Sequence, residues 1–249
     1  MGKSNKNNEL NKSEWDVCSV MKELENLGSL QIKKIYMRHG AEEPLFGVTT
    51  GNLKLLLKKI KKNHPLALAL YDTHHYDAMY FAGMIAEPDK MTKQDFEKWI
   101  QSAYCYAIAD YVVAAVLAQS PLGQELADLW LKSDQELYVL CAWACYSVML
   151  GYLKDEQFNK DKIQAMLSLV GKTIHNQPDR VRYAMNNFVI ATGISYLPLS
   201  HEAMCVAKII GVVEVDMKET QCKVPLASDY IQKAIDKGKL GYKRKKIRS

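Results

Sequence analysis

Helical periodicity runs through almost the whole of this chain and leaves little room for other secondary structure. Apolar residues recur at intervals of three and four, as they do on one face of an amphipathic helix. Alternating patterns typical of strands are nearly absent. Proline and glycine fall at the junctions between the periodic segments, at Pro44, Pro88, Pro121, Gly171, Pro178 and Pro198. The pattern predicts an all-α protein.

The expected helices follow one another with short connections. They cover approximately residues 13–28, 29–39, 52–62, 65–71, 75–86, 92–103, 104–119, 122–131, 134–152, 161–175, 179–195, 200–210 and 227–237. A short extended piece is expected at residues 211–215. Short connections make consecutive helices antiparallel neighbours. Helix pairs that repeat every ~35–45 residues predict a HEAT-like helical-repeat solenoid, an α-α superhelix whose concave face carries the function.

The charge distribution divides the chain into a body and a basic end. Net charge is +5, and seven positive charges with no acid lie from Lys237 onward, so the rest carries −2. We expect a flexible polar N-terminus over residues 1–12, one helical-repeat domain over 13–237 and a basic C-terminal tail over 238–249. The tail is either a solubilising end or an arm that contacts phosphates.

The N-terminus and the cysteines indicate the compartment. The first residues lack the apolar core of a secretory signal, and no apolar stretch reaches the length of a membrane span. We therefore expect a cytoplasmic protein with no membrane partner. The six cysteines are scattered without a Cys-x-x-Cys pair, which favours reduced thiols over disulfides. The residue pattern requires no metal and no cofactor.

One carboxylate stands alone in an apolar helix. Asp110 is the only charged residue between Lys98 and Glu125, and burying an ionised carboxylate is costly unless something pairs with it or uses it. In a regular helix Tyr106, four residues earlier, shares its face, and Tyr111 is adjacent. Asp110 is either a satisfied core residue or a functional one.

Basic residues cluster early in the chain. Lys33, Lys34 and Arg38 lie on one expected helix around Tyr36. Beyond the next loop a lysine-rich helix carries further charges at Lys54, Lys58, Lys59, Lys61 and Lys62. Faces of this kind suit a phosphate backbone, although solvated helix faces have the same composition.

Several of these stretches resemble a known family. They are Tyr36-Met-Arg-His followed by Leu45-Phe-Gly-Val and the lysine-rich helix, then Lys98-Trp99, the helix of Tyr106 and Asp110, and the stretch from Asp179 to Ile190. Together they are similar to the bacterial DNA alkylation repair enzyme family, the HEAT-like-repeat alkylpurine DNA glycosylases. The resemblance spans roughly residues 29–207.

The resemblance implies a specific activity. Such enzymes hydrolyse the N-glycosidic bond of cationic alkylated purines, 3-methyladenine and 7-methylguanine, in double-stranded DNA. The family's catalytic carboxylate falls on Asp110, and the aromatic residue four positions earlier falls on Tyr106. Tyr106, Tyr36, Asn187 and Arg182 become the substrate-binding candidates. The candidates for contact with the DNA backbone are Lys33, Lys34, Arg38, Lys54, Lys58 and Arg180.

The chain also departs from the family pattern. The family has a tryptophan at the position of Tyr106, an arginine within the stretch that corresponds to 138–143, and a second tryptophan near the position of Asn187. This chain has a tyrosine at the first position, no arginine in 138–143 and no tryptophan near Asn187. Arg180 and Arg182 either supply the missing arginine or are surface charges beside Asp179. Three functions remain open: a monomeric glycosylase acting on alkylated duplex DNA, a catalytically silent DNA-binding relative, and a helical-repeat scaffold that binds proteins.

Overall fold

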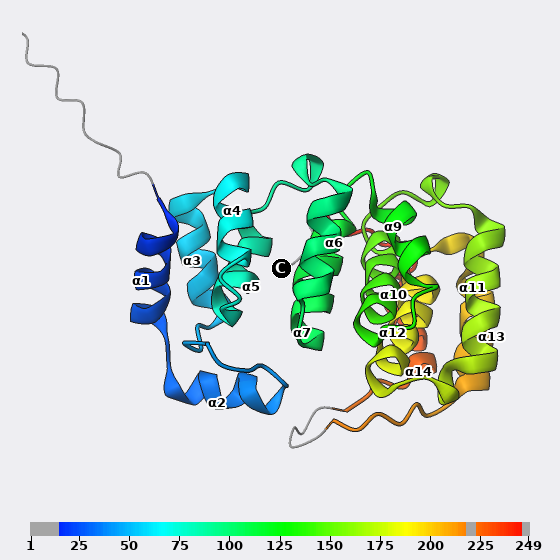
Figure 1. Ribbon diagram of the computed structural model, residues 1–249. Coiled ribbons are helices and arrows are strands. Elements are labelled where there is room, and N and C mark those ends of the chain that lie inside the picture. The colour runs from blue at the N-terminus through cyan, green and yellow to red at the C-terminus, as the bar shows by residue number, and fades with distance from the viewer. Residues whose placement is uncertain (1–14, 218–222, 246–249) are drawn as a thin grey trace, which may run out of the picture.

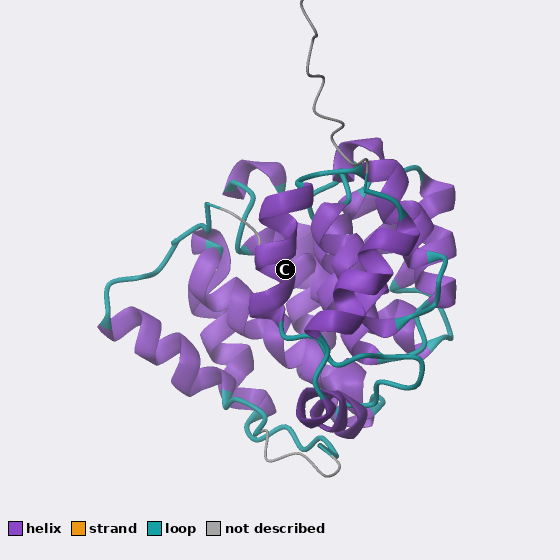
Figure 2. Ribbon diagram, turned by 90° about the vertical axis from the view of Figure 1, so that its left-hand side faces the viewer, coloured by secondary structure: helices purple, strands orange, loops and turns teal. Residues whose placement is uncertain are grey.

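The computed structural model describes residues 15–217 and 223–245, and within them every regular element is a helix (Figures 1 and 2). The main α-helices are α1 Val17–Leu27, α2 Leu30–Arg38, α3 Thr50–Ile60, α4 His64–Tyr71, α5 Tyr76–Ile85, α6 Lys93–Ser102, α9 Gly123–Trp130, α10 Glu136–Leu150, α11 Lys160–Thr173, α12 Asp179–Ser195, α13 Ser200–Ile210 and α14 Ala227–Asp236. The expected helix of residues 104–119 comprises α7 Tyr106–Ile108, a π-helical segment η2 Ala109–Ala114 and α8 Ala115–Leu117. The all-α prediction is confirmed.

Helix ends agree closely with their sequence signals. α12 and α13 have the predicted bounds, and Pro65 lies in the first turn of α4. The predicted start of the first helix at residue 13 lies outside the described residues. In the structure Asp16 caps α1, where its carboxylate accepts a hydrogen bond of 2.8 Å from the Ser19 backbone N–H. The extended piece expected at 211–215 forms no strand in the described part of the chain.

The helices stand in a row of pairs that builds two layers (Figure 1). The first helix of each pair packs on the second: α4 on α5, α6 on η2, α9 on α10, α11 on α12 and α13 on α14. The second helices also contact one another in the order α5, η2, α10, α12, α14. They form one continuous inner layer. α2 runs crosswise below α1 and α3 in the view of Figure 1.

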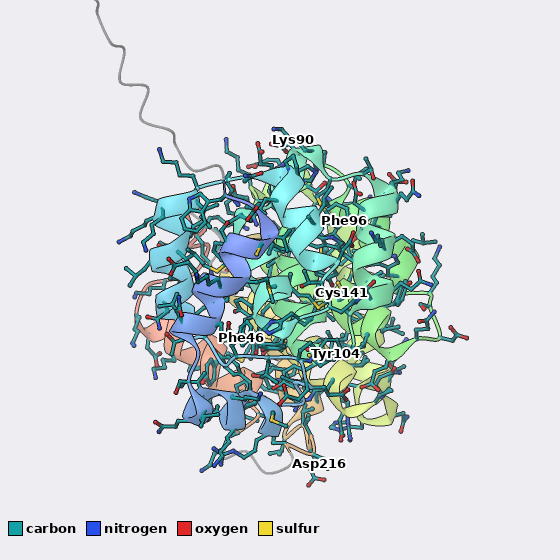
Figure 3. The ribbon with its side chains drawn as sticks, turned by 60° about the vertical axis from the view of Figure 1, so that its left-hand side comes forward. Phe46, Lys90, Phe96, Tyr104, Cys141 and Asp216 are labelled. Atoms are coloured by element: carbon teal, nitrogen blue, oxygen red, sulfur yellow. The ribbon has the colours of Figure 1, made fainter. Side chains whose placement is uncertain are left out.

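Nearly all the buried apolar residues form one cluster, which extends from Val20 to Ile231. Trp130 and Trp143 belong to it, as their apolar neighbours predict. Cys141 lies in the middle of the molecule (Figure 3), and Cys105, Cys141 and Cys145 are buried free thiols. The domain boundaries at residues 12 and 237 stay predictions, and residues 1–12 are outside the described ranges.

A buried carboxylate fixes the loop between α2 and α3. Asp77 is 1% exposed on α5, and it accepts backbone hydrogen bonds from Phe46 (2.7 Å), Gly47 (3.1 Å) and Val48 (2.7 Å). Three N–H donors satisfy the charge that burial would otherwise leave unpaired. Gly47 has a φ of +81°, and a Cβ there would come within 2.4 Å of the Lys33 backbone nitrogen. The loop therefore holds α2 in a fixed position against α5.

The described part of the basic C-terminal tail lies against the body. The Gly241 N–H donates to the Ile194 carbonyl and the Arg244 N–H to the Gly151 carbonyl, each at 2.8 Å. Lys243 Nζ donates to the Leu150 carbonyl at 2.6 Å. These carbonyls end α10 and α12, where a positive charge is favourable. Residues 239–245 thus form a fixed segment across the ends of two inner helices.

Candidate nucleic-acid interface

Three adjoining pockets follow the inner layer of helices. The first has a volume of about 290 Å³ and lies between α2, α3, α5, α7 and α12. The second, about 450 Å³, lies between η2, α10 and α12, and the third, about 290 Å³, lies between α12, α14 and the terminal segment. Tyr111 and Tyr183 line both the first and the second. Ile194, Ser195 and Arg244 line both the second and the third. We call this continuous surface the groove.

Tyrosines dominate the first pocket. Its walls include Tyr36, Tyr76, Tyr80, Tyr106, Tyr111 and Tyr183. The Tyr36 hydroxyl donates to the Val48 carbonyl at 2.9 Å, and its ring lies 5.3 Å from that of Tyr76. Burial raises the pKa of Tyr80 to about 12. The rings offer apolar faces, and the raised pKa keeps the Tyr80 hydroxyl protonated at neutral pH.

A permanent positive charge lies inside this aromatic pocket. The guanidinium of Arg180 sits 3.8 Å from the centroid of the Tyr106 ring, a cation–π distance. The Tyr106 hydroxyl is 2.8 Å from His39 Nδ1. Burial first, and then the charges of Arg180 and Arg38, lower the pKa of His39, which keeps the imidazole neutral at pH 7.

Asp110 lines the second pocket, within the π-helical segment η2. Its carboxylate is half-buried and receives no hydrogen bond from the described residues. Burial raises its pKa to about 7, and the charge of Arg180 acts in the opposite direction. At neutral pH the group is therefore present in both protonation states. Perturbed acids and π-helical turns both occur often at functional sites.

A π-helical segment begins at Ala109, between Tyr106 and Asp110. Tyr106 lines the first pocket and Asp110 the second, with Tyr111 between them in both walls. Arg180 contacts the Tyr106 ring and its charge also acts on Asp110, and the expected common face of Tyr106 and Asp110 stays a prediction.

Asn187 and Arg182 have different surroundings on α12. Asn187 lines the second pocket beside Asp110. Arg182 lines none of the three pockets and pairs with Asp179. Asn186 is buried and donates to the Pro225 carbonyl at 2.8 Å, which gives it a structural role. Arg182 therefore stays a predicted substrate contact without a place in the groove.

Sequence reasoning missed Tyr183 as a residue of the groove. It lies one helical turn before Asn187 and lines the first and second pockets. The spacing of four residues on α12 was the available signal. The stretch 138–143, which lacks the family arginine, instead faces the interior: Tyr138 donates to Glu97 at 2.7 Å, and Trp143 packs on Phe188.

The early basic residues lie at the α2–α3 end of the groove. Lys34, Arg38, Lys54 and Lys58 are exposed, and Lys33 pairs with Glu43 at 2.6 Å. Thr50 lines the first pocket. Lys54 and Lys58 follow it at intervals of four along α3, so they extend its face away from the pocket.

Residues 15–217 and 223–245 contain no group of three or more His, Cys, Asp or Glu side chains placed to hold a metal ion. None of the helices there is long and apolar enough to cross a membrane.

Paired helices in two layers, with a groove along the inner layer, define a HEAT-like helical-repeat protein. A solved structure with the same fold superimposes with a TM-score of 0.88, at 48% identity over 94% of this chain and 100% of that one. It is described as a new family of proteins related to the HEAT-like repeat DNA glycosylases, with affinity for branched DNA structures.

The chain belongs to the DNA alkylation repair enzyme family, which it matches over residues 20–208. An uncharacterized protein of Listeria monocytogenes is 31% identical over 222 residues, which cover 87% of this chain and 96% of that protein. An uncharacterized protein of Listeria innocua is 30% identical over 217 residues, covering 85% and 94%. The family resemblance seen in the sequence is confirmed.

Proposed function

We propose that this protein binds branched DNA in its groove and that recognition of a structured DNA, not base excision, is its main activity. The stacking of Arg180 on Tyr106 carries the proposal. A glycosylase for alkylated purines needs an aromatic face for a cationic base. Here an internal cation already covers that face, and its charge repels a second one.

The same arginine suits a DNA backbone. Its guanidinium presents several N–H donors in a plane, which matches the oxygens of a phosphate. The exposed basic residues of α2 and α3 add charges that can contact further phosphates. The 48% identity to a protein described as having affinity for branched DNA supports the branched form of the ligand.

Binding measurements test the proposal directly. The affinities for a three-way junction, a four-way junction and a linear duplex of matched length are compared at two salt concentrations. We expect tighter binding to the junctions and a steep salt dependence. Arg180→Ala should weaken junction binding about tenfold, in the range that phosphate contacts supply. Equal affinity for junction and duplex would contradict the proposal, and an absence of DNA binding would favour a protein-binding scaffold.

Base excision is a second candidate because Asp110 lines an open pocket and forms no ion pair with another of the described residues. A purine alkylated at N3 or N7 is already a cationic leaving group. When its N-glycosidic bond breaks, the base leaves as a neutral purine and positive charge remains on the sugar. An ionised Asp110 would stabilise that charge and orient a water, which bonds to C1′ as its proton passes to solvent. The tyrosines would hold the base.

Release of 3-methyladenine and 7-methylguanine from methylated DNA distinguishes the two candidates. If excision occurs, we expect Asp110→Asn to abolish it while DNA binding is retained. The rate should rise with pH through about 7, because only the ionised carboxylate is active. Equal excision by the Asn variant and the parent would remove Asp110 from the reaction. An absence of base release by the parent would leave DNA binding as the activity.

A further inference from the structure

The third pocket is a basic site formed by the C-terminal part of the chain. Lys233 of α14, Lys237 just after its end, Lys239, and Arg244 of the terminal segment line it, together with Tyr230 and Tyr242. No acidic residue belongs to its wall. None of the four cations pairs with an acid among the described residues, and all four are exposed. The pocket therefore concentrates positive charge that the fold itself does not use.

Specific contacts hold this charge in place. α14 packs tightly on α12, where a Cβ on Gly193 would come within 2.4 Å of Ile231. The backbone of the terminal segment is tied to α10 and α12 through Gly241 and Arg244. Lys243 pairs with Asp155 at 2.8 Å and so anchors the segment without entering the pocket. The cations thus project from an ordered frame, which is the arrangement of a binding site.

The residue types indicate a phosphate ligand joined to sugars. Lysine and arginine supply charge and N–H donors for phosphate oxygens. Tyr230 and Tyr242 are 54% and 61% exposed beside them. Exposed aromatic rings next to cations are typical of nucleic-acid surfaces, where they pack on sugars or bases.

The middle of the groove separates this site from the other basic region. Between the α2–α3 end and the third pocket lies the second pocket, with Asp110 and two tyrosines in its wall. One backbone running along the whole groove would place phosphates against that carboxylate, which is unfavourable. Two DNA backbones that enter the groove from opposite ends avoid this contact with Asp110. The central tyrosines would then face the point where the arms meet and bases are unstacked.

We infer that the third pocket binds the backbone phosphates of a second duplex arm, while the α2–α3 end binds the first. This inference rests on the proposed function. It gives the chain a reason to prefer a junction over a linear duplex: only a branched DNA presents two arms to the two basic regions at once. Linking two contacts in one ligand raises the total affinity through effective concentration.

The test replaces the third pocket's lysines. A triple variant, Lys233→Ala, Lys237→Ala and Lys239→Ala, is compared with the parent on a four-way junction and on a linear duplex with the same number of phosphates. A control variant removes three exposed lysines outside the three pockets, Lys132, Lys172 and Lys208. A Lys→Arg triple variant at the pocket positions should restore binding. Thermal unfolding verifies that every variant is folded.

We expect the pocket variant to lose at least about tenfold in junction affinity and to change the duplex affinity by less than about threefold. The slope of log affinity against log salt for the junction should become shallower by about 2–3, roughly 0.9 for each lost phosphate contact. Inorganic phosphate should displace the bound junction no more than chloride does at the same ionic strength. Selective displacement would indicate a site for free phosphate and overturn the second-arm assignment.

Three further outcomes have definite meanings. Unchanged junction binding, or an equal loss on junction and duplex, would overturn the inference and leave the proposed function standing. An equal loss in the control variant would show that net charge alone is responsible, and it would overturn the inference as well. A parent protein without any preference for the junction would contradict the proposed function itself, and this inference with it.

Discussion

The guanidinium of Arg180 on α12 lies 3.8 Å from the ring centroid of Tyr106 on α7. The contact joins two helices far apart in the chain and brings a permanent positive charge close enough to influence His39 and Asp110. One side chain therefore sets the electrostatics of the first two pockets. It also occupies the aromatic face on which the proposed choice between DNA binding and base excision depends.

Removing this charge should shift two titrations in the same direction. In Arg180→Ala the pKa of Asp110 should rise above about 7, because the only described positive charge that lowers it is gone. The lowered pKa of His39 should also move upward. Carboxyl and imidazole NMR titrations measure both. Arg182→Ala is the matched control, because Arg182 pairs with Asp179. Unchanged values in the Arg180 variant would contradict the proposed coupling.

The carboxylate of Asp110 should make the protein less stable as the pH rises. Its pKa in the folded state, about 7, is above that of an exposed aspartate, so between about pH 4 and 7 the folded protein holds a proton that the unfolded chain releases. Asp110→Asn should therefore raise the free energy of unfolding at about pH 8 by ~1–3 kcal/mol and leave it nearly unchanged near pH 4. Urea unfolding at both pH values measures this. A gain independent of pH would argue against ionisation of Asp110.

The loop that positions α2 should depend on a single acid. Asp77→Ala removes the acceptor of three backbone hydrogen bonds and should cost about 3 kcal/mol of unfolding free energy. Asp77→Asn keeps one oxygen and should cost about half as much. Asp72→Ala is the control, since its exposed pair with Lys98 should contribute less than about 1 kcal/mol. Equal costs for the Ala variants at positions 72 and 77 would contradict this assignment.

Alanine substitutions at two glycines of the terminal region distinguish the cost of backbone strain from that of a steric clash. Gly238 and Gly241 both have positive φ angles, +60° and +73°. A Cβ on Gly238 would meet nothing within 4 Å, whereas one on Gly241 would come within 2.8 Å of Leu197. Both alanine variants should carry about 1 kcal/mol of strain, and Gly241→Ala should add about 1 kcal/mol from the collision.

Hydrogen exchange at the Arg244 amide measures the attachment of this segment, because that amide donates to the Gly151 carbonyl. Exchange should be about tenfold or more faster in Gly241→Ala than in the parent, with a smaller change in Gly238→Ala. Identical exchange in the two variants would show that the Leu197 contact does not hold the segment.

Local sequence signals predicted the helices well because capping and periodicity act over a few residues. The bounds of α12 and α13 and the position of Pro65 in α4 illustrate this. The same signals could not predict the π turn. The apolar run around Asp110 is compatible with either an α or a π turn. The structure has a π turn there, in the segment η2 that packs between α5 and α10.

By itself the sequence determined the all-α class, most helix ends and the family to which the chain belongs. It also showed that Asp110 is the only charged residue between Lys98 and Glu125. These properties depend on short-range periodicity and on residue identity. Only the tertiary structure decided which side chains meet. It placed Tyr106 and Asp110 in adjoining pockets, brought Arg180 onto Tyr106, added Tyr183 to the groove and placed Arg244 in the wall of the second pocket. Such contacts join residues distant in the chain, and no local pattern encodes them because they depend on how whole helices pack.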